Sequence, residues 1–387
     1  MVENKDKKVL NVPNLRFPEF EGEWEKHYLS DYLDFKNGLN PKPERFGKGI
    51  RFISVMDILN NAVITNDCIR ASVDVSEEEL LNFCVENGDI LFQRSSETLE
   101  DVGRANVYMD NKPAVFGGFV IRGKKKAEYD PLFFRYLLAS PFARKKIIPM
   151  GAGAQHFNIG QEGLNKVKLH FALLDEQKKI ARLLSLLDER IAIQNKIIED
   201  LKKLKSAISE RLFKDAKGDV ITLSEICDIV KGEQINGELL SEHGKYYVMN
   251  GGTDPSGYYD NYNVGAYTIS ISEGGNSCGY VQFNKCPFWC GGHCYSIQNI
   301  ADNVNNLYLY HYLKTEEKAI MKLRIGSGLP NIQKKDLATF KIKLPTSKQQ
   351  KAISDILSLL EQKAEIEKQI LIAMQDEKQY LLRQMFI

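Results

Sequence analysis

Apolar residues recur at alternating spacings of three and four along a stretch of the chain that contains no Gly or Pro from Asp175 to Lys214. The apolar positions are Leu184, Leu187, Ile191, Ile198, Leu201, Ile208 and Leu212. This spacing predicts a long helix with an a/d heptad seam on one face. Forty residues in this form make a rod of roughly 60 Å.

A second stretch repeats the first after a shift of 173 residues. Its seam consists of Leu357, Leu360, Ala364, Leu371, Met374, Leu381 and Met385. Polar residues interrupt both seams at the same two places: Gln194 and Lys205 in the first, Glu367 and Lys378 in the second. Polar seam residues typically fix register and partner number. Two equal rods in one chain most simply pair with each other, and separate homodimeric coiled coils are the alternative.

The repeat extends beyond the predicted helices, and searching for it first sets the architecture. The matching pairs are Leu29-Ser30-Asp31 with Leu223-Ser224-Glu225, Gly38 with Gly232, Gly117-Gly118 with Gly291-Gly292, Gly151-Ala-Gly with Gly326-Ser-Gly, and Asn158-Ile159 with Asn331-Ile332. Chance similarity between leucine-rich helices would not reproduce this glycine pattern. The chain is therefore one unit written twice, a mixed domain followed by a helix.

Each mixed domain contains β-branched and aromatic runs bounded by turns, which predict strands. The runs are Ile50–Val55, Asp89–Phe92, Ala114–Phe116 and Phe119–Ile121 in the first, and Val264–Ser272 and Tyr295–Ile297 in the second. Short helices are expected at Pro131–Leu138 and Asn306–Leu313. We therefore expect an α+β chain with mixed α/β domains at 14–174 and 215–345, and long helices at 175–214 and 346–387.

Composition limits the environment of the chain. Lys and Arg number 52 against 51 Asp and Glu, so any nucleic-acid face has to be a local patch. No apolar stretch approaches the ~20 residues that span a bilayer, and the lysine-rich start, Met1 to Lys8, does not read as a secretory signal. Seven cysteines at irregular spacing do not form a disulfide pattern. These features indicate a cytoplasmic protein.

A search for catalytic motifs finds no P-loop, no His-Glu-x-x-His, no Gly-x-Ser-x-Gly and no Asp-Pro-Pro-Tyr element. We therefore expect no catalytic residues and no cofactor in this chain. Cys286, Cys290, His293 and Cys294 lie within nine residues, as zinc ligands could. However, the last three align with Phe116, Phe119 and Val120 across the repeat. Strand packing is the favoured interpretation, and we expect no metal site.

Candidate DNA-binding residues are polar and basic side chains in predicted loops and strand ends. Arg51 belongs to a stretch where Lys42, Arg45 and Lys48 alternate with Phe and Gly, and Arg94 follows an apolar strand. Arg suits guanine or phosphate, and Asn and Gln suit adenine edges. The candidates are Arg51, Arg94, Ser95, Ser96, Arg104, Gln155, His156 and Asn158 in the first domain, and Ser272, Glu273, Asn276, His293, Ser327 and Asn331 in the second.

For each candidate, an ordinary polar loop is the alternative interpretation. Lys124 to Lys126 is expected to form a solvated turn.

The opening Val12-Pro13-Asn14-Leu15-Arg16-Phe17-Pro18-Glu19-Phe20, followed by Gly22-Glu23-Trp24, Leu29-Ser30 and Gly38, resembles the start of the specificity (S) subunit of type I restriction–modification systems. Asn250-Gly-Gly-Thr-Asp-Pro-Ser-Gly-Tyr, followed by Ser272 to Gly275 and Phe288-Trp289 to His293, is similar to the same family. The resemblance covers essentially the whole chain, and the duplicated plan of a domain followed by a helix is quite specific to it.

The resemblance implies two target-recognition domains that each read half of a bipartite DNA site. It implies two long helices paired as an antiparallel coiled coil with pseudo-twofold symmetry. Two methyltransferase subunits, which use S-adenosylmethionine, would dock on the helices. Two restriction subunits, ATP-dependent motor–nucleases that need Mg, would complete the complex, and the S subunit itself is non-catalytic.

Two other classes of function stay open. A coiled-coil protein–protein scaffold with two globular binding heads would fit the same layout. A self-contained methyltransferase or nuclease conflicts with the missing motifs.

Overall fold

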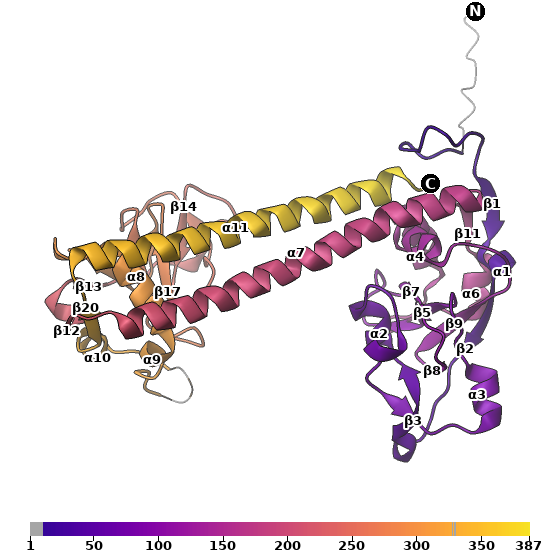
Figure 1. Cartoon of the computed structure of the whole chain (residues 1–387), viewed down its shortest axis with the longest axis horizontal. Helices are drawn as coiled ribbons and strands as arrows, with labels where there is room; N and C mark the ends of the chain where they lie inside the picture. The colour runs from indigo at the N-terminus through magenta and orange to yellow at the C-terminus, as the bar shows by residue number, and fades with distance from the viewer. Residues whose placement is uncertain (1–10, 327, 329) are drawn as a thin grey trace, which may run out of the picture. The chain divides into compact units, whose positions relative to one another are not determined.

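The computed structural model describes residues 11–326, 328 and 330–387 and divides the chain into two compact units (Figure 1). The first unit comprises Met1–Asn195 and Ile370–Ile387, and the second comprises Lys196–Gln369. The polar start predicted at Met1 to Lys8 and the candidate Ser327 lie outside the described residues. Each unit contains one mixed module and part of each long helix, α7 (Leu174–Asp215) and α11 (Ser347–Gln384).

The first module contains two main sheets, ordered β2-β9-β5-β7 and β4-β3-β8, and β3 and β8 are parallel. Its strands are β1 (Glu25–Tyr28), β2 (Leu33–Asn37), β3 (Phe46–Ile53), β4 (Ser72–Val73), β5 (Ile90–Gln93), β6 (Ser95–Ser96), β7 (Ala105–Val107), β8 (Ala114–Phe116), β9 (Val120–Lys125), β10 (Phe157–Asn158) and β11 (Lys168–Phe171). Its helices are α1 (Leu29–Tyr32), α2 (Val55–Asn60), α3 (Glu77–Phe83), α4 (Pro131–Ala139), α5 (Pro141–Ile147) and α6 (Gln161–Lys166).

The second module repeats this topology with sheets ordered β13-β19-β16-β17 and β15-β14-β18, and β14 and β18 are parallel. Its strands are β12 (Asp219–Thr222), β13 (Asp228–Lys231), β14 (Tyr246–Met249), β15 (Tyr258–Tyr259), β16 (Thr268–Ser272), β17 (Val281–Asn284), β18 (Trp289–Cys290), β19 (Cys294–Gln298) and β20 (Lys341–Leu344). Its helices are α8 (Asn306–Thr315), α9 (Glu317–Met321) and α10 (Lys334–Ala338). The internal repeat predicted from the sequence is thus confirmed in the two main sheets, whereas β6 and β10 are, in the described part of the chain, strands only in the first module.

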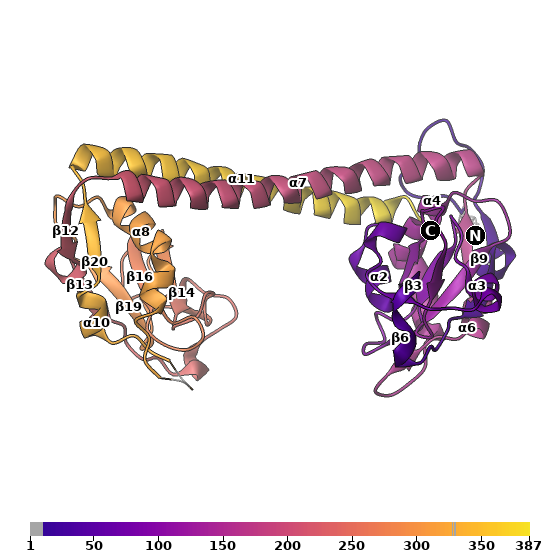
Figure 2. The same cartoon turned by 60° about the horizontal axis from the view of Figure 1, so that its bottom comes forward.

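The long helices run antiparallel, which follows from each unit separately. In the first unit Leu184, early in α7, shares an apolar core with Leu381, late in α11. In the second unit Leu212, late in α7, packs in a cluster with Ile353, early in α11. The start of one helix therefore meets the end of the other, as both views show within each unit (Figures 1 and 2).

A buried glutamine joins each module to the first turn of its long helix. Gln177 Oε1 accepts from the backbone N of Asp130 at 3.0 Å, while its Nε2 donates to the carbonyl of Ala172 at 2.8 Å. Gln350, the equivalent residue, accepts from the backbone N of Asn305 at 2.8 Å. Asp130 and Asn305 are the residues that cap α4 and α8, so the same side chain orients a module helix in both units.

The two seam lysines pair with carboxylates on the other long helix. In the first unit Lys378 donates to Asp188, which also accepts from the hydroxyl of Tyr136 at 2.8 Å. In the second unit Lys205 donates to Glu361, which accepts from the hydroxyl of Tyr310 at 3.1 Å. Asp188 and Glu361 are 173 residues apart, so the repeat preserves the ion pair.

The third member of each cluster differs between the units. Arg135 Nη1 lies 3.3 Å from Asp188 Oδ2. In the second unit the third member is His311, with Nε2 3.0 Å from Ser358 Oγ and Nδ1 3.9 Å from Glu361 Oε1. The third group near the carboxylate is therefore a guanidinium in one unit and a buried imidazole in the other.

One local expectation was wrong. Lys124 and Lys125 belong to β9, where they pair with Asp34 and Leu33, instead of forming a solvated turn. The Lys124 ammonium lies 2.9 Å from Glu86 Oε1, and the Lys125 ammonium lies 4.7 Å from the ring centroid of Tyr129. Lys124 and Lys125 therefore continue an inner strand of the sheet, which a run of three lysines did not indicate.

The buried imidazole makes the stability of the second unit depend on pH. Burial lowers the pKa of His311 to about 4, whereas the unfolded chain takes up a proton below the ordinary histidine pKa of about 6.5. The free energy of unfolding should therefore decrease as pH falls from about 6.5 to about 4, by up to about 3 kcal/mol. His311→Gln should remove this component, which urea unfolding at pH 7.5 and pH 5 would measure.

The exposed His243 provides the matched control, since His243→Gln should leave the pH dependence unchanged. Parallel pH profiles for His311→Gln and the native chain would contradict the assignment.

Candidate functional site

The loop that follows β5 forms the centre of a polar cluster in the first module. Ser95 and Ser96 form β6, which pairs with Asn158 and Phe157 of β10. The Ser95 hydroxyl donates to Asn158 Oδ1. β6 lies at the end of the first unit that is remote from α7 (Figure 2). Three of the predicted candidates thus share one surface.

Arg94 connects this cluster to a second turn. Its backbone N donates to the carbonyl of Phe119 at 2.9 Å, and its Nη1 donates to the carbonyl of Gly118 at 3.2 Å. Its own carbonyl accepts from the backbone N of Ile159 at 2.9 Å. Arg94 is half-buried and makes hydrogen bonds to backbone groups, so its guanidinium is held in one position.

The other candidates of the first module lie in different settings. Gln155 and His156 are exposed in the loop before β10. Arg51 lies within β3, paired with Ser72 of β4, and is half-buried. Arg104 is exposed, and its Nη2 lies 2.6 Å from Asp101 Oδ1. The structure therefore brings Arg94, Ser95, Ser96 and Asn158 together and leaves Arg51 in a different sheet.

In the second module, two candidates are buried and already bonded. The Ser272 hydroxyl donates to the carbonyl of Gly251 at 2.7 Å. Glu273 is only 9% exposed, and its Oε1 accepts from Lys231 Nζ at 2.7 Å and from the Tyr295 hydroxyl at 3.1 Å. Both side chains hold the loop together from inside.

Asn276, His293 and Asn331 are the exposed candidates of the second module. Asn331 exchanges backbone hydrogen bonds with Ile325 and lies opposite Gly274, as Asn158 does with Ala152 and Ser95. The backbone N of Glu273 donates to the carbonyl of His293 at 2.9 Å, which reproduces the bond between Arg94 and Phe119. The two modules thus build the same loop cluster from different side chains.

Sequence reasoning missed one member of this cluster. Phe119 was expected in a buried strand, but its side chain is 68% exposed, at the position equivalent to His293. The preceding Gly-Gly turn explains the exposure, because it packs closely on another glycine. A Cβ on Gly38 would lie 2.2 Å from the carbonyl oxygen of Gly117, and one on Gly232 would lie 2.3 Å from that of Gly291.

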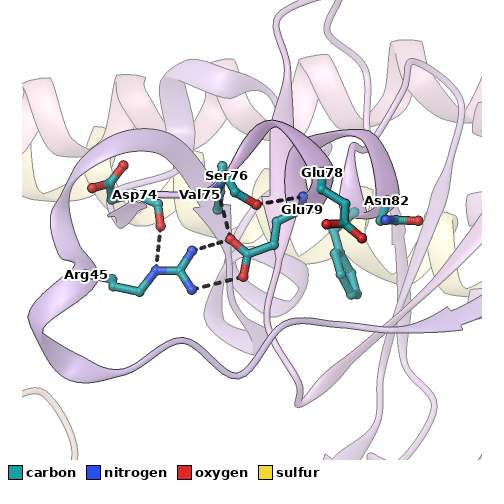
Figure 3. A pocket seen from close by; sticks show the side chains of 8 residues that line it. Arg45, Asp74, Val75, Ser76, Glu78, Glu79 and Asn82 are labelled. Atoms are coloured by element: carbon teal, nitrogen blue, oxygen red, sulfur yellow. Dashed lines mark hydrogen bonds and ion pairs between the residues drawn. The ribbon is translucent and has the colours of Figure 1, made fainter.

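The basic stretch around Arg45 does not form a free cationic patch. Arg45 makes a two-pronged ion pair with Glu79 at the edge of a hollow of about 670 Å³ (Figure 3). The guanidinium and the backbone N of Ser76 lower the pKa of Glu79 to about 2. Asp74 and Glu78 also line the hollow, so its walls are predominantly acidic.

The cysteine cluster is divided between interior and surface. Cys290 and Cys294 are buried beside Phe288, whereas Cys286 and His293 are exposed. Among the described residues, no group of three or more His, Cys, Asp or Glu side chains is arranged to hold a metal ion. All seven cysteines are free thiols.

Within the described part of the chain, every helix is too short or too polar to cross a membrane.

Comparisons with known proteins agree with this duplicated architecture. The family model described as "Type I restriction modification DNA specificity domain" matches the chain twice, over residues 21–203 and 217–375. A type I restriction enzyme specificity subunit of Methanocaldococcus jannaschii is 26% identical over 93% of this chain and 92% of its own length. A type I specificity subunit of Mycoplasma genitalium is 34% identical over 37% of this chain and 38% of its own.

Solved structures show the same fold. The S subunit of a type I restriction–modification system from M. genitalium covers 97% of this chain and 99% of its own, with a TM-score of 0.65 at 21% identity. A chain from a structure on complex assembly and conformational transition of the type I restriction–modification system covers 93% of this chain and 96% of its own, with a TM-score of 0.59 at 15% identity. With two copies of the specificity domain spanning most of its length, this chain belongs to the specificity-subunit family of type I restriction–modification systems.

Proposed function

We propose that each module reads one half of a bipartite DNA sequence, and that the chain acts as the recognition subunit of a complex whose chemistry belongs to other subunits. The observation that carries this proposal is the loop cluster, which occurs at equivalent backbone positions in both modules with different side chains. Two modules that recognise different half-sites need the same fold with different side chains in the loops that contact DNA.

The side chains of the first cluster have the chemistry for reading base edges. A positioned guanidinium can bind guanine through two hydrogen bonds, and an amide such as Asn158 or Gln155 can bind adenine in the same way. Phe119 adds an exposed ring, which can stack on a base or wedge between base steps. In the second module Asn276, His293 and Asn331 supply the corresponding contacts.

The paired helices would set the distance between the two half-sites. Each half-site offers only a few base contacts, worth about 1–3 kcal/mol for each good pair. Joining two readers through a stiff spacer multiplies their discrimination by raising the effective concentration of the second. It also excludes sites with the wrong gap.

Besides the apolar seam between them, the long helices carry exposed apolar residues that support docking of partner subunits. Leu186 and Ile193 of α7 are exposed in the first unit, and Leu359 and Ile366 of α11, 173 residues further on, are exposed in the second. Each pair is seven residues apart and therefore lies on one helix face. Exposed apolar rows of this kind are typically covered by a partner protein.

We assign one methyltransferase subunit to each row. S-adenosylmethionine would bind in these methyltransferase subunits, and ATP and Mg would bind in two restriction subunits. This assignment leaves the present chain non-catalytic. Its free thiols and its DNA target fit the cytoplasm.

The direct test is selection from a random duplex library by this chain co-expressed with its methyltransferase partner, together with methylome sequencing of cells with and without the gene. Enrichment of one split motif that matches the methylated motif supports the proposal. Binding without any preferred sequence would favour a protein scaffold.

Exchanging residues 14–174 for the same segment of a relative should change one half of the recognised motif and leave the other half unchanged. The reason is that each module has its own core and loop cluster. Methylome sequencing measures the outcome. A change in both halves would contradict modular reading.

Inserting one heptad into both long helices, after Asn195 and after Gln369, should lengthen the tolerated gap. Seven residues add about 10 Å, which corresponds to about three base pairs. The motif selected by the inserted chain would reveal the new gap. An unchanged gap would show that the helices are not the spacer.

Phe119→Ala should weaken binding to the cognate duplex by roughly fivefold or more, because base–aromatic stacking contributes about 1–3 kcal/mol. The exposed ring contributes little to the core, so the melting temperature should be unchanged. Fluorescence anisotropy measures the affinity, and Phe119→Trp should restore it. Phe142→Ala, at a 38% exposed phenylalanine of α5, is the matched control. Equal loss in both variants would rule out stacking by Phe119.

A further inference from the structure

A cationic groove of about 450 Å³ crosses the first unit between α2, α4, α5 and the last turns of α11. Arg104, Arg135, Arg144 and Lys378 line it, and Glu100 is the only carboxylate among its lining residues. Asp101 pairs with Arg104, and Asp188 pairs with Arg135 and Lys378, so the groove keeps a modest excess of positive charge.

Arg144 is the cation in this groove that the protein itself balances least. Its Nη2 donates to the backbone carbonyls of Glu100 at 2.8 Å and Val102 at 2.7 Å, and its Nη1 has no hydrogen-bond partner among the described residues. By contrast, Arg135 and Lys378 share the carboxylate of Asp188. Burial and the neighbouring Arg104 lower the pKa of Arg144 to about 10. An anion in the groove would compensate this charge.

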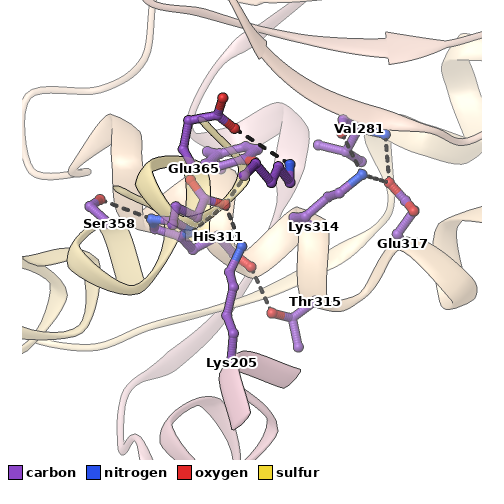
Figure 4. Close-up of polar contacts among 11 residues, drawn as sticks. Lys205, Val281, His311, Lys314, Thr315, Glu317, Ser358 and Glu365 are labelled. Carbon is purple, nitrogen blue, oxygen red and sulfur yellow. Dashed lines mark hydrogen bonds and ion pairs between the residues drawn. The ribbon is translucent and has the colours of Figure 1, made fainter. Parts of the chain in front are cut away.

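The second unit has a groove of about 260 Å³ in the equivalent place, between α7, α8 and α9. Four lysines line it, Lys202, Lys205, Lys314 and Lys318, against the two carboxylates of Glu210 and Glu317. Figure 4 shows Lys314 paired with Glu317, and Lys205 close to His311 at the helix α8 wall.

The two grooves correspond through the internal repeat. Lys205 matches Lys378 after a shift of 173, and His311 matches Tyr136, because Asn305 and Asp130 cap α8 and α4 in the same way. The remaining cations come from different positions: Arg104 and Arg144 have no basic counterpart in the second groove, and Lys314 occupies the place of Ala139. The positive charge is thus maintained while its residues have changed, which indicates that the charge itself is required.

We infer that both grooves bind phosphate groups of the DNA backbone, one beside each half-site. This inference rests on the proposed function and adds to it a sequence-independent contact. Phosphates are the same at every half-site, so they explain why two modules with different reading loops retain the same charge. With a net charge of only +1, the chain needs such local patches to hold DNA.

Each groove is linked by a backbone hydrogen bond or a ring contact to the strand that leads into the loop cluster of its own module. In the first unit the carbonyl of Arg104 accepts from the backbone N of Gln93 at 2.7 Å, one residue before Arg94. In the second unit the Lys314 ammonium lies 3.9 Å from the ring centroid of Tyr280, whose carbonyl accepts from the backbone N of Ser272 at 2.9 Å. A duplex read by the loops would bring its backbone close to these cations.

The test uses the full chain assembled with its methyltransferase partner and measures anisotropy across a salt series, on the cognate duplex and on a random duplex. Arg144→Gln and Lys318→Gln should each weaken binding to both duplexes by the same factor, about tenfold at low salt. Each should also reduce the slope of log K against log salt by about one. Lys348→Gln, at an exposed lysine in the first turn of α11 outside both grooves, should change neither quantity.

Arg104→Gln, at an exposed side chain, gives the same readout if Arg144→Gln fails to fold. An unchanged salt slope in the groove variants would overturn the inference. So would a loss of partner assembly with unchanged DNA binding, which would assign the grooves to an acidic protein segment, or a loss confined to the cognate duplex. The proposed function fails separately, if the native complex does not prefer its cognate duplex.

Discussion

The ion pair between a seam lysine and a carboxylate of the opposite long helix is the constraint on which each unit depends. Lys378 with Asp188, and Lys205 with Glu361, place charged pairs among the apolar residues of the seam. Their side chains are between 18% and 33% exposed, so each charge is partly desolvated and costly to leave alone. A slip of one helix along the other would separate both partners, whereas leucines alone would tolerate it.

The same carboxylate also anchors the module. Asp188 accepts from Tyr136 of α4, and Glu361 accepts from Tyr310 of α8, so helix register and module orientation share one residue in each unit. Lys343 continues this logic at the end of α7, where its ammonium donates to the carbonyls of Phe213 at 3.0 Å and Lys214 at 3.2 Å. The scaffold is thus determined at few points, and the loops beyond it can change without disturbing it.

Much of this architecture could be predicted from the sequence because the repeat supplied an internal control. The matching seams predicted both long helices, and the matching Gly38 and Gly232 proved to be positions of close backbone packing. The strand order could not be predicted, since β5 and β9 pair through contacts between distant segments. The α+β class, the two tandem modules and the antiparallel helices are confirmed.

The candidate site was harder to predict, because polarity alone does not distinguish a surface contact from an internal hydrogen bond. Ser272 and Glu273 make internal hydrogen bonds, whereas Phe119, which was predicted in a strand, is exposed. Whether any of the fourteen candidates touches a base stays a prediction.

The exposed apolar rows have a consequence for how the chain can evolve. Because Leu186 and Ile193 recur as Leu359 and Ile366, a single polypeptide presents the same apolar docking residues twice, while its two modules carry different loops. Replacing the loops of one module would alter the DNA target without changing the surface that partner subunits contact. Such a chain can acquire a new sequence specificity through a single recombination event, with its partner subunits unchanged.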